Sequence, residues 1–281
     1  MGRCLAHGNS QESLRVSWAE IERMASAAAV IDDCRRELAA RHRNIVSEAL
    51  ADNPAAEWQH YPDGEVYDPK SHAQYFYHTH PVSGGPVREH GHFHTFLRAE
   101  GMPVGAAPLI LPEIAVADVP ALPPQAPPLK RGTREEVSHL VAIAVDCRGE
   151  PIRLFTTNRW VTGETWYRAD DVIRMLDRFA ITEVEASETL NRWVGGMLRL
   201  FRPQIAALLR MRDQTVMAWR RRRRTHVFED PALEITSSLD IGFDAQLAFL
   251  DRVRSEAVAR APHRVPLLPA MAEGWGEGQA S

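Results

Sequence analysis

The sequence predicts an α+β protein, in which a small antiparallel sheet or partial barrel is flanked by N-terminal and C-terminal helices. Two observations predict this class. Apolar residues recur at helical spacing near both ends of the chain, whereas aromatic residues and threonines, which strands prefer, concentrate in the middle. We expect the sheet near residues 73–160, inside a single domain that spans residues 17–260.

The first helix is expected over residues 17–39. Ser17 and Glu20 have the spacing of a capping box, in which the serine oxygen accepts a backbone N–H that the helix itself cannot use. Trp18, Ile21 and later apolar residues then follow at helical intervals. A second, shorter helix is expected over 43–50.

Four strands are expected in the middle of the chain, at 73–80, 90–97, 138–146 and 152–157. The stretch 81–86 supplies turn residues between the first two strands, and Cys147–Gly149 forms the turn between the last two. Residues 103–131 carry many prolines, which indicates an extended connection. This connection is either a lid over the histidine-rich strands or a plain surface linker.

The last third is expected to be helical. Asp170 is a candidate cap for a helix ending near Phe179, and Thr182 with Glu185 is a candidate capping box for a helix toward Leu200. Further helices are expected from Pro203 and over residues 244–260. Residues 1–16 are expected to be a disordered N-terminus, and residues 261–281 a frayed tail.

Composition excludes several broad classes of protein. The net charge of −4 gives no general attraction to nucleic acid or to anionic membranes. No secretory signal or membrane span is visible, and the three cysteines are scattered without a CxxC pair. We therefore expect a cytoplasmic protein with no membrane partner. The sequence does not define its oligomeric state.

Histidines are strongly clustered. Of twelve in the chain, seven lie between His60 and His94. Side chains two residues apart in a strand share a face, so His78 and His80 are expected on one face, together with Phe76. Likewise, His90, His92 and His94 are expected on one face of the next strand. If the two strands pair, their imidazoles converge in a way that suits one divalent transition metal, such as Fe, Zn or Cu.

Further residues can complete this site. His139 is a candidate ligand or a plain core histidine, and His60 and His72 are expected to be structural. Glu89, Asp63 and Tyr77 are candidates to orient a ligand or bound water from behind. A histidine-lined site that binds no metal is the alternative to a metal centre.

A polar segment after the strand at 152–157 is a candidate substrate-binding region. Asn158, Arg159 and Glu164 belong to it, and Arg159 or Arg98 is a candidate clamp for a small anionic ligand. The alternative is a well-bonded turn anchored by tryptophans.

Three strings resemble a family of uncharacterised bacterial proteins. They are residues 60–68 (HYPDGEVYD), 89–98 (EHGHFHTFLR) and 154–164 (LFTTNRWVTGE). The resemblance extends over most of the chain and implies one coherent domain. It carries no activity, ligand or catalytic residue.

These observations favour a metal-binding protein, and a metalloenzyme that activates water, dioxygen or a carbonyl is one form of it. A non-catalytic metal- or ligand-binding protein is the competing class. The run Arg220–Arg224 follows Trp219 and suggests a third class, a nucleic-acid-associated protein. The negative net charge and the lack of a second basic stripe argue against that class.

Overall fold

The computed structural model describes residues 16–57, 59–79, 89–111, 136–184, 186–223 and 226–260. Its centre is one six-stranded sheet, and every strand pairs antiparallel with its neighbour in sequence order. The strands are β1 (Tyr61–Tyr67), β2 (Ala73–Thr79), β3 (Glu89–Arg98), β4 (Val137–Asp146), β5 (Pro151–Thr157) and β6 (Ile235–Asp240). The sheet is open, with β1 and β6 as its edges, so it forms no barrel.

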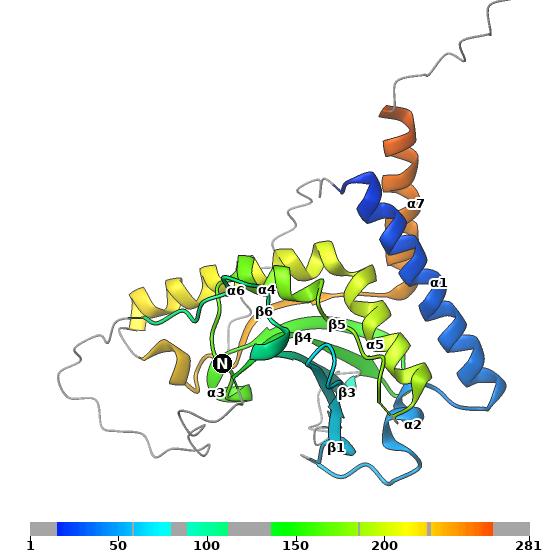
Figure 1. The fold of residues 1–281 in the computed structure, drawn as a ribbon, viewed down its shortest axis with the longest axis horizontal. Coiled ribbons are helices and arrows are strands. Elements are labelled where there is room, and N and C mark those ends of the chain that lie inside the picture. Colours follow the sequence, from blue (N-terminus) through cyan, green and yellow to red (C-terminus); the bar gives the residue numbers. More distant parts are fainter. Residues whose placement is uncertain are drawn as a thin grey trace, which may run out of the picture.

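Seven helices accompany the sheet in the described residues: α1 (Trp18–Ala40), α2 (Ile45–Leu50), α3 (Arg159–Thr162), α4 (Ala169–Leu176), α5 (Glu188–Leu200), α6 (Arg202–Arg223) and α7 (Phe243–Arg260). Two short 3-10 turns lie at Ala99–Gly101 and Val227–Glu229. Helices α4, α5 and α6 run along one side of the sheet, and α1 and α7 lie beside each other next to them (Figure 1). None of the described helices is long and apolar enough to cross a bilayer.

The main core lies between this helical layer and one face of the sheet. Trp193 of α5 is 1% exposed, and its ring centroid lies 5.3 Å from that of Phe93 on β3. The Tyr75 hydroxyl donates to Asn191 Oδ1 at 2.6 Å, so the polar tip of a buried ring is satisfied. Burying one such aromatic side chain stabilises the fold by roughly 1.5–3 kcal/mol. These helices do not cover the other face of the sheet, which carries His78, His92 and His94 (Figure 1).

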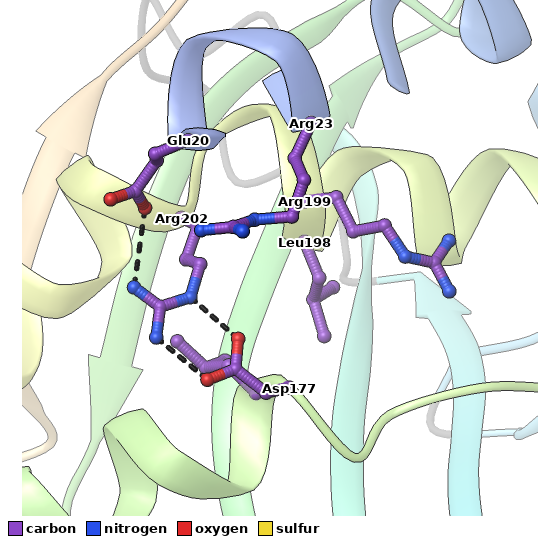
Figure 2. A pocket seen from close by; sticks show the side chains of 7 residues that line it. Glu20, Arg23, Asp177, Leu198, Arg199 and Arg202 are labelled. Carbon is purple, nitrogen blue, oxygen red and sulfur yellow. Dashed lines mark hydrogen bonds and ion pairs between the residues drawn. The ribbon is translucent and has the colours of Figure 1, made fainter. Parts of the chain in front are cut away.

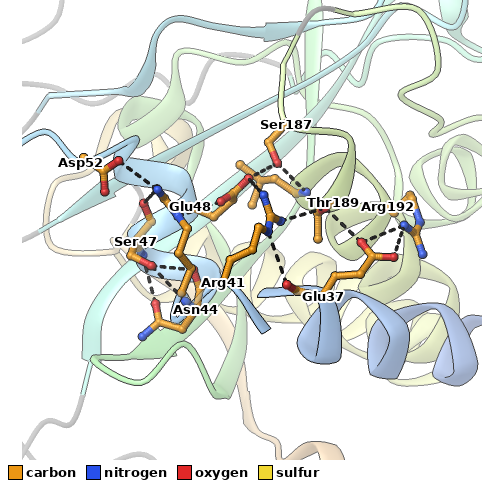
Figure 3. A network of polar contacts seen from close by, with 11 residues as sticks. Glu37, Arg41, Asn44, Ser47, Glu48, Asp52, Ser187, Thr189 and Arg192 are labelled. Atoms are coloured by element: carbon orange, nitrogen blue, oxygen red, sulfur yellow. Dashed lines mark hydrogen bonds and ion pairs between the residues drawn. The ribbon is translucent and has the colours of Figure 1, made fainter. Parts of the chain in front are cut away.

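Polar side chains tie α1 and α2 to α5 at the edge of this core (Figure 3). Arg192 Nη1 lies 2.9 Å from Glu37 Oε1, and the Thr189 hydroxyl donates to Glu37 Oε2 at 3.1 Å. Ser187 donates to Glu48 Oε1 of α2 at 2.5 Å. Partly exposed pairs of this kind contribute about 0–1 kcal/mol each, so apolar packing dominates at this junction.

A second junction joins α1, α4 and α6 around Arg202 (Figure 2). Its guanidinium makes two bonds to Asp177, at 2.7 and 2.8 Å, and one to Glu20 at 3.2 Å. These residues line a cavity of about 340 Å³. Because two carboxylates already neutralise Arg202, its visible role is to hold the three elements together.

The predicted α+β class, with an antiparallel sheet between N-terminal and C-terminal helices, is confirmed. Helix α1 begins after Ser17, whose Oγ accepts from Glu20 N at 3.3 Å as predicted. The strand β6 was not predicted, because residues 235–240 lie in a stretch read as helical. The residues 1–15 and 261–281, expected to be disordered and frayed, and most of the proline-rich segment lie outside the described residues.

Two predicted helix starts were wrong. Helix α4 follows Arg168 rather than starting with Asp170 as its cap, and α5 is capped by Ser187, which accepts from Leu190 N at 3.2 Å. Thr182 does not cap α5, because its backbone N–H and hydroxyl both bond to Asp68 Oδ2. A long-range partner thus replaced the local cap that the sequence suggested.

Candidate metal centre

Strands β2 and β3 have two chemically different faces, because side chains alternate along a strand. Toward the helices they place Tyr75 and Tyr77 on β2, and Phe93 and Leu97 on β3, all fully buried in the main core. The alternate positions form the opposite face, which holds Gln74, Phe76, His78, His92, His94, Phe96 and Arg98. Apolar burial of one set therefore fixes the histidines on the other.

Three imidazoles meet on this second face. His78 lies directly opposite His92 in the β2–β3 register, and His94 is two residues further along β3. His78 Nε2 lies 2.7 Å from His92 Nε2, which in turn lies 3.0 Å from His94 Nε2. One ring nitrogen from each of the three lies within 4.8 Å of the others, and all three side chains are buried. We call His78, His92 and His94 the triad.

The outer nitrogens of two triad rings have their own partners. The Glu89 carboxylate lies 2.7 Å from His92 Nδ1, and Arg153 holds the other oxygen of Glu89. His94 Nδ1 lies 3.0 Å from His139 Nε2. A carboxylate only accepts, so His92 carries its proton on Nδ1 and turns the lone pair of Nε2 toward the triad centre.

Hydrogen bonding alone uses this arrangement poorly, because two rings must share one acceptor nitrogen. A neutral imidazole nitrogen offers one lone pair, yet His92 Nε2 has two imidazole nitrogens within 3.0 Å. A cation at the centre would accept all three lone pairs at once. Nitrogens bound to one ion at ~2.1 Å stand roughly 3.0–3.5 Å apart, so small shifts of the rings suffice. The residues present therefore fit a metal ion.

Burial favours the neutral form of His94 and of His139, the form that metal ligation requires of a histidine. It lowers the pKa of His94 well below the ordinary histidine value, and the neighbouring imidazoles lower it further. Burial also lowers the pKa of His139 to about 3, with a contribution from the charge of Arg212. For Glu89, burial raises the pKa, but the bonds from His92 and Arg153 outweigh it and keep the carboxyl ionised.

The triad opens into a pocket of about 560 Å³. Its wall is largely aromatic near the triad, with Phe76, Phe96 and Phe155. His60 also lines it, stacked on Phe76 at a centroid distance of 3.7 Å, with Nδ1 2.7 Å from Glu65 Oε1. A buried cluster of histidines at the bottom of an aromatic pocket is typical of a binding site for a small molecule.

Comparison with protein-family models gives one match, which covers residues 25–241 and is described as a domain of unknown function, DUF6969. The chain belongs to the DUF6969 family. The triad and all residues that line the pocket lie within the matched DUF6969 region. No curated protein and no solved structure matches the chain. The family description assigns no chemistry to this site.

Within the DUF6969 region, His90 lies apart from the triad. Its Nδ1 lies 2.6 Å from the hydroxyl of Tyr77, whose ring belongs to the core on the helical side of the sheet. The register of β3 against β4 shifts between Glu89 and Gly91, and this bulge turns His90 away from His92 and His94. Tyr77 therefore accompanies His90 and does not reach the triad.

The other predicted ligands and orienting residues divide into two groups. Glu89 and His139 contact triad rings from outside, and His139 therefore lies behind His94 rather than beside it. The carboxylate of Asp63 bonds elsewhere. It accepts from Gln59 Nε2 at 3.0 Å on the exposed side of β1. His80 lies outside the described residues.

The predicted substrate-binding residues are also separated. Arg98 lines the pocket, whereas Arg159 lies outside the pocket lining and donates to Glu229 Oε1 at 2.7 Å in an exposed pair. Asn158 is buried as the cap of α3, and its Nδ2 donates to Val227 O at 2.7 Å. Glu164 is buried behind the cluster, where Oε2 accepts from the backbone N–H of His139 at 2.7 Å, and burial raises its pKa to about 7.

Sequence reasoning missed three contributors to the site. His60 was read as structural, although it precedes β1 and faces the pocket with Glu65. Arg153, which holds Glu89, was not singled out. Gly91 was also overlooked, although a Cβ there would stand 2.3 Å from the backbone oxygen of His78. The spacing of His92 and His94, and of Phe76 and His78, marked this face in advance.

Proposed function

We propose that the triad of His78, His92 and His94 binds one divalent transition metal, with Fe, Zn or Cu as the ions that imidazole ligands suit. One observation carries the proposal: His92 Nε2 faces two other imidazole nitrogens, at 2.7 and 3.0 Å, with its own proton directed to Glu89. A shared cation makes favourable use of all three inward nitrogens at once.

The pocket supports a centre that also meets a ligand. Three histidines leave a coordination position for a further molecule, as in metal sites that perform chemistry, whereas purely structural sites are closed by four protein ligands. A metal held there would polarise or activate a water, a dioxygen or a carbonyl group. Two further residues would hold the metal-binding imidazoles in place. Glu89 would orient the ring of His92, and His139 would orient the ring of His94.

A cobalt titration tests the proposal, because Co(II) reports its coordination in the visible spectrum. We expect metal-free protein to bind one Co(II), and His92→Ala or His94→Ala to abolish the absorption band. The matched control is His90→Ala, which removes a histidine from the same strand but outside the triad. The proposal is wrong if all three variants, folded by circular dichroism, bind Co(II) as the parent protein does.

The same titration separates a reactive centre from a closed one. Azide added to the Co(II) protein should change the visible spectrum if a coordination position faces the pocket. An unchanged spectrum would instead favour a non-catalytic metal-binding protein, the competing class.

A further inference from the structure

Arg98 lies in the same pocket as the triad but further along β3. Residues 92, 94, 96 and 98 alternate onto one face, so Arg98 projects into the pocket beyond Phe96. Four residues of extended strand separate the Cα atoms of His94 and Arg98 by about 13 Å. The pocket thus has a histidine end and an arginine end.

The Arg98 guanidinium is held in place but not neutralised. Its Nε donates to Gln74 Oε1 at 2.7 Å, and its Cζ lies 5.0 Å from the centroid of the Tyr67 ring. No carboxylate of the described residues pairs with it, in contrast to Arg202 and Arg159. Its two terminal nitrogens are therefore available to a ligand.

A chain of hydrogen bonds fixes Arg98 relative to the rest of the pocket. Gln74, which accepts from Arg98, donates through Nε2 to Glu65, and the other oxygen of Glu65 meets His60 Nδ1 at 2.7 Å. His60 stacks in turn on Phe76. This chain orders the guanidinium in advance, so a ligand that meets it loses little further side-chain entropy.

The wall between the two ends is flat and apolar. Phe76 and Phe96 stack across β2 and β3 with centroids 5.6 Å apart and planes 26° apart. Phe76 also lies 5.3 Å from the His94 ring. A planar apolar group can lie along this strip with offset-stacked or edge contacts, which such rings prefer.

The charges of the pocket limit the ligand's own charge. Glu65 and Glu234 line it together with Arg98, so one fixed cation stands against two carboxylates. A carboxylate matches the two terminal N–H groups of a guanidinium with a single negative charge. A phosphate would bring a second negative charge toward Glu65 and Glu234.

We propose that the pocket binds a planar, largely apolar monocarboxylate, with its carboxylate on Arg98 and its body along Phe76 and Phe96. Its far end then reaches the triad, and this last part rests on the proposed metal centre. Binding of the carboxylate itself requires only Arg98 and the aromatic strip.

Calorimetric titration with trans-cinnamate tests this proposal, with cinnamamide as the neutral analogue of the same shape. We expect cinnamate to bind metal-free protein more tightly than cinnamamide, and Arg98→Gln to weaken cinnamate by about 10- to 100-fold while leaving cinnamamide nearly unchanged. Arg159→Gln, which alters a paired arginine outside the pocket lining, is the matched control and should bind cinnamate as the parent does.

Three results would overturn the proposal: equal affinity for cinnamate and cinnamamide, undiminished cinnamate binding by Arg98→Gln, or no binding of cinnamate at millimolar concentration. Tighter binding of phenyl phosphate than of cinnamate would also contradict the assigned ligand charge. Co(II) titration of Arg98→Gln keeps the two proposals apart. We expect this variant to bind Co(II) normally. Loss of cinnamate binding alone therefore does not contradict the metal centre, and loss of Co(II) binding in the histidine variants does not contradict the Arg98 site.

Discussion

The Glu89 carboxylate lies 2.7 Å from Nδ1 of His92, on the edge of the imidazole opposite the nitrogen that faces His78 and His94. This contact sets the tautomer of His92 and points its lone pair at the triad centre. It also explains why Glu89 tolerates a nearly buried position, since His92 and Arg153 both bond to it.

Replacing Glu89 by Gln should weaken metal binding without removing a ligand. The amide keeps the shape of the side chain but loses the charge that orients His92, and losses of this kind reduce metal affinity by about 10- to 100-fold. Competition with a coloured zinc chelator measures the change. Asp63→Asn, a change of the same type at an exposed carboxylate, should bind Zn(II) as the parent does. Equal affinities for Glu89→Gln and the parent would contradict this account of His92.

Replacing Gly91 by Ala should disturb the pairing of β2 and β3 beside the triad. The added Cβ would meet the backbone oxygen of His78 at 2.3 Å and the Tyr77 hydroxyl at 2.5 Å, so the two strands must separate. We expect a loss of about 1–3 kcal/mol in the free energy of unfolding, measured in urea, together with weaker Co(II) binding. Gly242→Ala is the control, because no atom lies within 4 Å of its Cβ position. A Gly91→Ala protein as stable as Gly242→Ala would show that this close approach is not required.

Glu164 should make stability fall as pH rises. Burial raises its pKa to about 7, above that of an unfolded glutamate at about 4.3. Because its folded-state pKa is raised, Glu164 contributes to the free energy of unfolding. This contribution is complete below about pH 4 and is lost as pH rises through about 7. Metal-free parent protein should therefore lose on the order of 2–4 kcal/mol between pH 5 and pH 8 relative to Glu164→Gln. Parallel pH profiles of unfolding free energy for the two proteins would contradict the assignment.

Asp68 should act in the opposite direction. Its burial raises the pKa, but four backbone N–H groups, from Lys70, Ser71, Thr182 and Glu183, outweigh this and hold the pKa well below the ordinary range. This stabilisation is present above about pH 4 and is lost as pH falls toward the folded-state pKa. Asp68→Asn turns an NH₂ group toward two N–H donors, so we expect a loss of about 2 kcal/mol at pH 7 that shrinks at low pH. Urea unfolding at pH 7 and pH 3 measures this loss of unfolding free energy. An equal loss at the two pH values would be inconsistent with this role of Asp68.

Local pattern predicted much of the site. The spacing of His92 and His94, and of Phe76 and His78, placed each pair on one face, because alternation needs only the strand itself. His90 departed from the pattern because a bulge between Glu89 and Gly91 shifts the register, and a register shift depends on the neighbouring strand.

Long-range contacts account for the rest. Strand β6 is short and semi-exposed, and it is held by bonds such as Thr236 Oγ1 to the backbone oxygen of Thr156, 80 residues earlier. Arg153 reaches Glu89 only because β5 and β3 flank β4 in the same sheet. Neither relationship leaves a mark at fixed spacing in the sequence.

The most direct test of the metal centre is elemental analysis of untagged protein, purified without chelators and without added metal. The triad predicts about one equivalent of Fe, Zn or Cu per chain, and a loss of that metal in a folded His92→Ala, His94→Ala double variant. Protein that carries no metal, and takes up none when Fe(II), Zn(II) or Cu(II) is supplied, would contradict the account and leave a histidine-lined pocket without a metal.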